Sequence, residues 1–162
     1  YTLIGITLIG IILATAMPQI EKMKDKAIIE QTVSALQVLD SKMQEVGQTQ
    51  GSVGKVSFKI AKGNLNINSS ADSIKYILED TKLEASEPNV EIRNGNIILK
   101  TEKIGSKFKI SLTMNYNNFN LTYKDEETTR TINAGATAYS ILIENKGAGD
   151  INSKTQIDFD VI

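Results

Sequence analysis

Residues 3–14 read Leu-Ile-Gly-Ile-Thr-Leu-Ile-Gly-Ile-Ile-Leu-Ala, and no charged residue comes before Glu21. A helix of about 17–20 such residues is roughly 26–30 Å long, which matches the hydrocarbon core of a bilayer. Because the segment is apolar on all sides, it cannot be a surface helix with one face in water. It has no basic leader and no typical cleavage site, so we expect a retained anchor or packing helix rather than a secretory signal peptide.

The helical pattern continues beyond Pro18. Residues 21–26 predict a solvated patch of mixed charge, and glycines 47, 51 and 54 then end the helix. We therefore predict one helix over residues 1–46, kinked or loosened at the helix-breaking Pro18, and a Gly-rich hinge over residues 47–54. Apolar residues at spacings of three, four or seven predict the face that packs against the rest of the chain: Ile29, Val33, Leu36, Leu39 and Met43.

After Gly54 the period of the apolar residues changes to two, which is typical of strands with one buried face. Val56, Phe58 and Ile60 form the first such set, and Asn94-Gly95 between two apolar runs predicts a hairpin. Residues 55–162 hold eight to ten such sets. The fold class is therefore predicted to be α+β, a long helix followed by an antiparallel sandwich or barrel. The last set, residues 155–162, pairs either within its own sheet or along the edge of a neighbouring copy.

Composition excludes several classes of function. The chain has 162 residues, 41% of them hydrophobic, with 18 basic and 19 acidic residues and neither Cys nor His. Without these residues the chain cannot have a disulfide framework, a zinc finger, a haem attachment site or a Cys or Ser-His nucleophile. It also lacks the surplus of basic residues that is typical of proteins that bind nucleic acid. The carboxylates at 125–127 and the pair Asp158 and Asp160 are interpreted as solvated surface. We expect no enzyme, no catalytic or metal residues, no cofactor and no small-molecule substrate.

Two sequons stand in the β-rich part. Asn68-Ser69-Ser70 and Asn120-Leu121-Thr122 match the acceptor pattern for N-glycosylation, although an Asn-rich chain also produces this pattern by chance. Asn68 is predicted to lie at a turn, which makes it the better candidate.

The N-terminal residues resemble those of a known family. Tyr1-Thr2-Leu3-Ile4, followed by Ala14-Thr15-Ala16-Met17-Pro18, resembles the mature N-terminus of type IV pilin-like proteins over the first 45–50 residues. Gly5 stands where bacterial major pilins usually carry glutamate, and Pro18 comes about one turn early. The cysteine-free, β-rich remainder is therefore more similar to archaeal adhesion pilins.

The resemblance implies a structural subunit of an extracellular filament, with a role in adhesion or surface attachment. Tyr1 is then the processed N-terminus left by a prepilin peptidase, and the assembly machinery draws the subunit from the membrane into a helical homopolymer. The apolar residues expected in the polymerisation core are Leu3, Ile4, Ile6, Leu8, Ile9, Ile11, Ile12 and Leu13. Two alternatives remain: a monomeric surface-binding domain on a single-pass membrane anchor, and a secretion-system pseudopilin.

Overall fold

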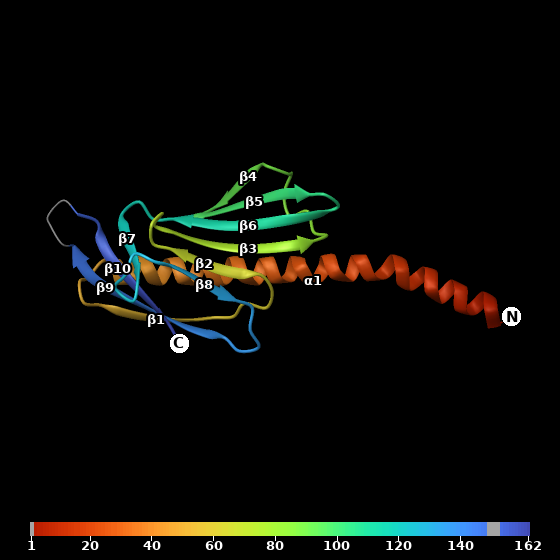
Figure 1. The fold of residues 1–162 in the computed structure, drawn as a ribbon, viewed down its shortest axis with the longest axis horizontal. Helices are drawn as coiled ribbons and strands as arrows, with labels where there is room; N and C mark the ends of the chain where they lie inside the picture. Colours follow the sequence, from red (N-terminus) through yellow and green to blue (C-terminus); the bar gives the residue numbers. More distant parts are fainter. Residues whose placement is uncertain (1, 149–152) are drawn as a thin grey trace.

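The computed structural model describes residues 2–148 and 153–162, with side chains from residue 16 onward. Helix α1, Thr2–Gly47, is one continuous element of 46 residues. Pro18 lies inside it, and the chain stays helical on both sides of this residue. Proline removes one backbone hydrogen bond and crowds the preceding turn, which bends a helix without ending it where the flanking residues remain helical. The ribbon bends in its N-terminal part (Figure 1).

Ten strands follow the helix. We call these strands and the segments that connect them the head (residues 53–162). Within the described residues no second helix occurs. The predicted α+β class, a helix followed by a mostly antiparallel β-domain, is confirmed. The strands are β1 Val53–Phe58, β2 Asn64–Asn68, β3 Ser73–Thr81, β4 Glu91–Asn94, β5 Ile97–Ile104, β6 Lys107–Asn115, β7 Phe119–Tyr123, β8 Thr129–Asn133, β9 Tyr139–Ala148 and β10 Thr155–Val161.

The strands form two open sheets, in the orders β1-β9-β10-β7 and β4-β5-β6-β3-β2-β8. Neither order closes on itself, so the barrel alternative is wrong. The prediction that all strands are antiparallel is also wrong, because β10 pairs with β7 in parallel. Parallel neighbours need a long crossover, and here the chain passes through β8 and β9 before it returns beside β7. The last strand therefore pairs within its own chain, as the first of the two alternatives predicted.

The predicted hairpin joins β4 to β5, but its turn lies one residue later than expected. Asn94 pairs with Ile97, so the two turn residues are Gly95 and Asn96. Gly95 has φ of +61°, the left-handed region that suits glycine at the first central position of a type II′ turn. The sequence pattern places the turn over Asn94-Gly95 instead.

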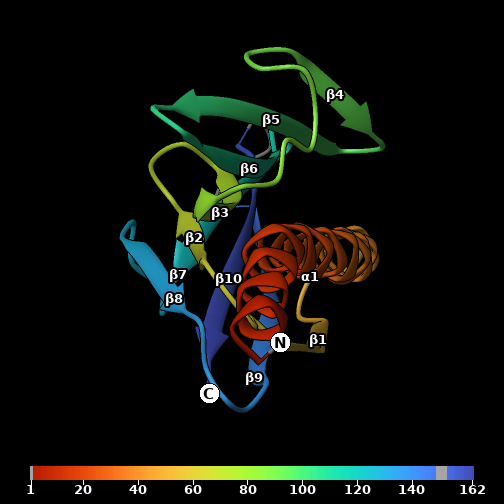
Figure 2. The same ribbon diagram turned by 90° about the vertical axis from the view of Figure 1, so that its right-hand side faces the viewer.

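Helix α1 and both sheets share one hydrophobic core. Buried members include Leu36 and Met43 of the helix, Ile74 of one sheet, and Ile141 and Phe159 of the other. Figure 2, which looks along the helix, shows β3 to β6 above it, β1 and β9 below it, and the remaining strands beside it. The helix thus fills the concave side of the head. Burial of such side chains, at about 1.5–3 kcal/mol each, stabilises the pairing of helix and head.

The segment between helix and head, predicted as a hinge, is held by hydrogen bonds. The carbonyl oxygen of Val46 accepts from Ser52 Oγ at 2.7 Å and from Asn145 Nδ2 at 2.9 Å. The amide of Gly51 donates to the carbonyl oxygen of Asn145 at 2.8 Å. Gly54 permits a close approach, because a Cβ atom there would lie 2.8 Å from Cγ2 of Val46 and from two side-chain carbons of Lys42. These contacts fix the direction in which the helix leaves the head.

Candidate functional site

Helix α1 packs against the head through residues spaced alternately by four and by three. This spacing keeps successive side chains on one face of a helix. We call this set the docking stripe. All of its members are buried, and they are Asp25, Ile29, Thr32, Leu36, Leu39, Met43 and Val46.

Four of the five residues predicted to pack against the head lie on the docking stripe. Ile29, Leu36, Leu39 and Met43 are at most 5% exposed. Val33 is half-buried at the margin of the core, and Thr32 takes the position on the stripe. The prediction from the sequence chose the apolar residue at 33, whereas the strict alternation of four and three that starts at Asp25 passes through 32. The buried Thr32 hydroxyl donates to the carbonyl oxygen of Ile28 at 2.7 Å, which satisfies its hydrogen bond within the helix.

A carboxylate lies at the N-terminal end of the docking stripe. Asp25 is 5% exposed, so the prediction that all of residues 21–26 are solvated is wrong for this residue. Lys62 Nζ donates to its two carboxylate oxygens at 2.8 and 3.0 Å, and Thr81 Oγ1 donates to one of them. The charge is tolerated because it is paired and hydrogen-bonded. The sequence feature that indicates the burial of Asp25 is its position, four residues before Ile29 and in phase with the docking stripe.

A second carboxylate ties the C-terminal half of the helix to the head. Asp40 Oδ1 accepts from Asn96 Nδ2 at 3.1 Å and from the Tyr116 hydroxyl at 2.9 Å. Burial raises the pKa of Tyr116, and the nearby Asp40 charge raises it further, so the phenol stays protonated and donates. The two contacts connect α1 to the β4–β5 turn and to the residue that follows β6.

Part of the helix surface is apolar and uncovered. Met17, Ile20, Met23 and Val38 are 63%, 49%, 73% and 58% exposed, and none of them belongs to the docking stripe. Three of the four precede Asp25, where α1 extends beyond the head (Figure 1). The described part of this extension therefore carries three large apolar side chains that are exposed to solvent.

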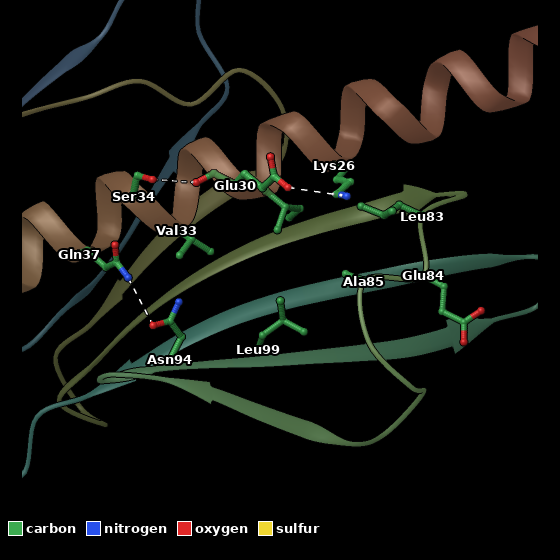
Figure 3. Close-up of a pocket in the computed structure, with 11 residues that line it drawn as sticks. Lys26, Glu30, Val33, Ser34, Gln37, Leu83, Glu84, Ala85, Asn94 and Leu99 are labelled. Carbon is green, nitrogen blue, oxygen red and sulfur yellow. Dashed lines mark hydrogen bonds and ion pairs between the residues drawn. The ribbon is translucent and has the colours of Figure 1, made fainter.

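A groove of about 750 Å³ lies between α1 and the β3–β5 side of the head. Its floor includes Val33 of the helix, Leu83 and Ala85 of the β3–β4 connection, and Leu99 of β5. Figure 3 shows Val33 and Leu99 pointing toward one another across it.

Polar side chains surround this apolar floor. Gln37 Nε2 donates to Asn94 Oδ1 at 3.5 Å at one end, and Lys26 pairs with Glu30 at 3.9 Å along the helix. Sequence analysis did not find this groove, because its walls come from segments about fifty residues apart.

The predicted polymerisation core lies in the part of the chain whose side chains are not described. Leu3, Ile4, Ile6, Leu8, Ile9, Ile11, Ile12 and Leu13 belong to helix α1, and nothing follows about their contacts. Tyr1 lies outside the described residues. Among residues 16–148 and 153–162, no helix has the length and apolar character needed to cross a membrane.

The two sequons differ in their surroundings. Asn68 ends β2, and its Oδ1 accepts from the amide of Ala71 at 3.1 Å, while Ser70 of the same sequon is exposed. Asn120 lies within β7, and the hydroxyl of Thr122 in that sequon is buried and donates to Asp158 at 2.7 Å. Only the first sequon presents its hydroxyl residue to solvent.

Asp158 corrects another prediction. It is 8% exposed, not solvated, and its Oδ1 also accepts from the amide of Asp125 at 2.7 Å. The carboxylate therefore stabilises the turn after β7. Across the part of the chain that the structure describes, no group of three or more carboxylates is arranged to hold a metal ion.

Helix α1 is thus the candidate functional element, with one face docked on the head and another uncovered. Comparison of the chain with protein-family models, with curated proteins and with solved structures finds no match.

Proposed function

We propose that this chain is a structural subunit of an extracellular type IV pilus-like filament, similar to archaeal adhesion pilins, that acts in adhesion or surface attachment. Its N-terminal helix is held in the membrane after a prepilin peptidase exposes Tyr1. The assembly machinery then transfers the helix into the core of a helical homopolymer, and the heads face outward. No catalysis is part of this role.

The observation that carries the proposal is the uneven use of helix α1. The docking stripe begins at Asp25, although the helix begins at Thr2. Residues 2–24 would span about 35 Å at 1.5 Å per residue, a length comparable to the docked part. A helix that extends so far beyond its own head is suited to contacts with other molecules.

The composition of the extension favours a partner that is itself apolar. Residues 3–13 contain eight leucine and isoleucine side chains. At about 1.5–3 kcal/mol for each buried side chain, leaving all eight in water costs about 12–24 kcal/mol. A bundle of identical helices removes this cost, and the small residues Gly5, Gly10 and Ala14 allow close approach of helix backbones.

For the head, we propose a sandwich in which the two sheets face each other and α1 covers the open side. Inward-facing residues of both sheets belong to one core cluster, among them Leu65 of β2 and Ile157 of β10. A head of this kind presents its polar faces to solvent. We also propose Asn68 as the glycosylated residue, since its sequon is the accessible one.

The test replaces Ile9 or Ile12 with Lys in the full chain. A charge in the apolar segment is expected to abolish filaments, scored by negative-stain microscopy, because a buried charge without a partner costs several kcal/mol. Ile9→Leu is the matched control and is expected to assemble. Near-ultraviolet circular dichroism checks that the head stays folded. Intact filaments from Ile9→Lys would refute the proposal, and wild-type chains that occur only as detergent-soluble monomers would support the membrane-anchored alternative.

A further inference from the structure

A small polar hollow lies at the end of the head where helix α1 ends. Its volume is about 230 Å³, and its walls come from α1, the β4–β5 turn and the connection from β6 to β7. Figure 1 shows the end of β6 and the C-terminal end of α1 at the same end of the molecule, far from the N-terminal extension. Gln44 in the wall follows Asp25 by 19 residues, so the hollow lies about 28 Å along the helix from the start of the docking stripe.

Side-chain amides from all three segments line this hollow, which we call the amide hollow. The amides are those of Gln44, Asn96, Asn115, Asn117 and Asn118. An amide carries both hydrogen-bond donors and an acceptor, so it can bind a hydroxyl group in either direction. Within the described residues no charged side chain lines the hollow, although charged residues make up 23% of the chain. The lining therefore suits an uncharged ligand that carries several hydroxyl groups.

The amides of the β6–β7 connection are not needed to form its turn. Asparagine is common in turns because it tolerates a positive φ or because its side chain hydrogen-bonds to nearby backbone. Asn117 and Asn118 are not among the described residues that have a positive φ. Across the described part of the chain, the amides of the hollow other than Asn96 form no hydrogen bond to the protein. These amides are therefore free to bind a ligand.

Two aromatic residues add an apolar wall. Tyr116 and Phe119 line the hollow with ring centroids 6.2 Å apart, and they are only 3% and 8% exposed. Rings buried in this way offer no open face on which a nucleobase could stack. An acidic ligand would need a Lys or Arg partner, which the lining does not supply. A neutral sugar ring needs neither, because its hydroxyl groups suit the amides and its C–H groups suit the apolar wall.

We propose that the amide hollow binds one neutral sugar ring of a surface glycan. Its volume of about 230 Å³ is below the ~300–1,000 Å³ typical of sites for drug-sized molecules, so it suits a single ring. This inference rests on the proposed function, in which filaments act in adhesion, and names the chemistry that the head recognises. A filament displays many copies of the hollow, so weak binding at each copy adds up to firm attachment.

The test measures retention of wild-type filaments on polyacrylamide beads that carry mannose, galactose, glucose or N-acetylglucosamine. We expect retention on at least one of these neutral sugars and release by the same sugar in solution. Beads that carry sialic acid serve as the charged comparison and are expected to retain nothing, because the hollow has no cationic side chain.

A double variant and a matched control assign the binding to the hollow. Asn117→Ala with Asn118→Ala removes two exposed amides and is expected to weaken binding by about tenfold or more. Asn133→Ala is the control, because Asn133 is also exposed but lies on β8 and does not line the hollow. The control is expected to bind like the wild type. Near-ultraviolet circular dichroism checks that the variants keep their fold.

A second measurement uses the wild-type chain alone. The full chain, labelled with ¹⁵N in detergent micelles, is titrated with the methyl glycosides of the four neutral sugars. We expect the side-chain amide resonances of the hollow to shift and that of Asn133 to stay in place. This titration decides the matter where the double variant does not fold.

The outcomes separate this inference from the proposed function. Filaments that no neutral sugar retains, or equal retention of the double variant and the control, would overturn the sugar site and leave the filament role intact. Retention on sialic acid alone would also overturn it. If the wild type forms no filaments, the proposed function fails, and the titration decides the sugar site by itself: shifts confined to the hollow support it, and unchanged resonances exclude it.

Discussion

The two halves of helix α1 differ in what covers them, although they form one continuous element. From Asp25 to Val46, every third or fourth side chain is buried against the head. Before Asp25, the described side chains are exposed or half-buried, among them Met17 and Met23. Since an apolar surface is stable only where it is covered, the first half depends on other molecules and the second half on its own head. Stability of the head thus depends on the second half of the helix, and the proposed assembly would use the first half.

The largest effect on stability is expected on the docked half. Leu39 is fully buried and its neighbour Val38 is 58% exposed. Leu39→Ala is expected to lower the free energy of unfolding by about 2–5 kcal/mol, because it leaves a cavity in the core. Val38→Ala is expected to change it by less than about 0.5 kcal/mol. Denaturant unfolding of the full chain in mild detergent measures both values. Equal losses for the two variants would show that the head does not depend on the docking stripe.

A smaller effect is expected at the boundary between the halves. Asp25→Ala removes the partner of Lys62 and Thr81, and a loss of about 1–3 kcal/mol is expected for hydrogen bonds to a charged group. Glu21→Ala is the control, because it removes the exposed ion pair with Lys82 at 2.9 Å and should cost less than about 1 kcal/mol. Amide hydrogen exchange over residues 25–32 should rise only in the first variant. If both variants exchange alike, the boundary does not lie at Asp25.

The smallest effect on stability is expected only at alkaline pH. Burial raises the pKa of Tyr76, which packs beside the N-terminal end of the docking stripe, from 10.0 to about 12. The unfolded chain loses this proton first, so stability is unchanged below pH of about 10 and falls as the pH rises toward 12. Tyr116, whose pKa is also raised, acts in the same direction.

The variant Tyr76→Phe removes the titrating group and should flatten this decline. Unfolding midpoints measured between pH 8 and 12 provide the check, with tyrosinate absorbance as the readout of ionisation. A decline in the variant as steep as that of the wild type would mean that Tyr76 titrates normally and that its site is open to water.

Much of the local structure follows from periodicity. The alternation around Val56 and Phe58 predicts β1, and the spacing of Leu36, Leu39 and Met43 predicts the docked face, because each pattern is set by the geometry of its own element. Contacts that join distant segments carry no such local signal. The parallel pairing of β7 with β10 and the groove between α1 and β5 are of this kind.

The burial of certain polar residues is also not predicted by the sequence pattern. Asp25, Thr32 and Asp158 are buried, although their residue types predict solvent exposure. Each is satisfied by specific partners: Asp25 by Lys62 and Thr81, Thr32 by its own helix, and Asp158 by β7. A pattern of apolar residues cannot identify such positions. Their phase can, and Asp25 and Thr32 both lie in register with apolar members of the docking stripe.

The position of the last strand has a consequence for how the molecule is made. β10 lies between β9 and β7, and β7 joins its sheet only through β10. The sheet therefore cannot be completed until β10, Thr155–Val161, is available. During synthesis β10 emerges after the other nine strands of the head, so closure of the core is delayed until β10 is available. A copy truncated before β10 would lack the strand that connects β7 to its sheet, and such a copy should be unfolded and open to proteolysis.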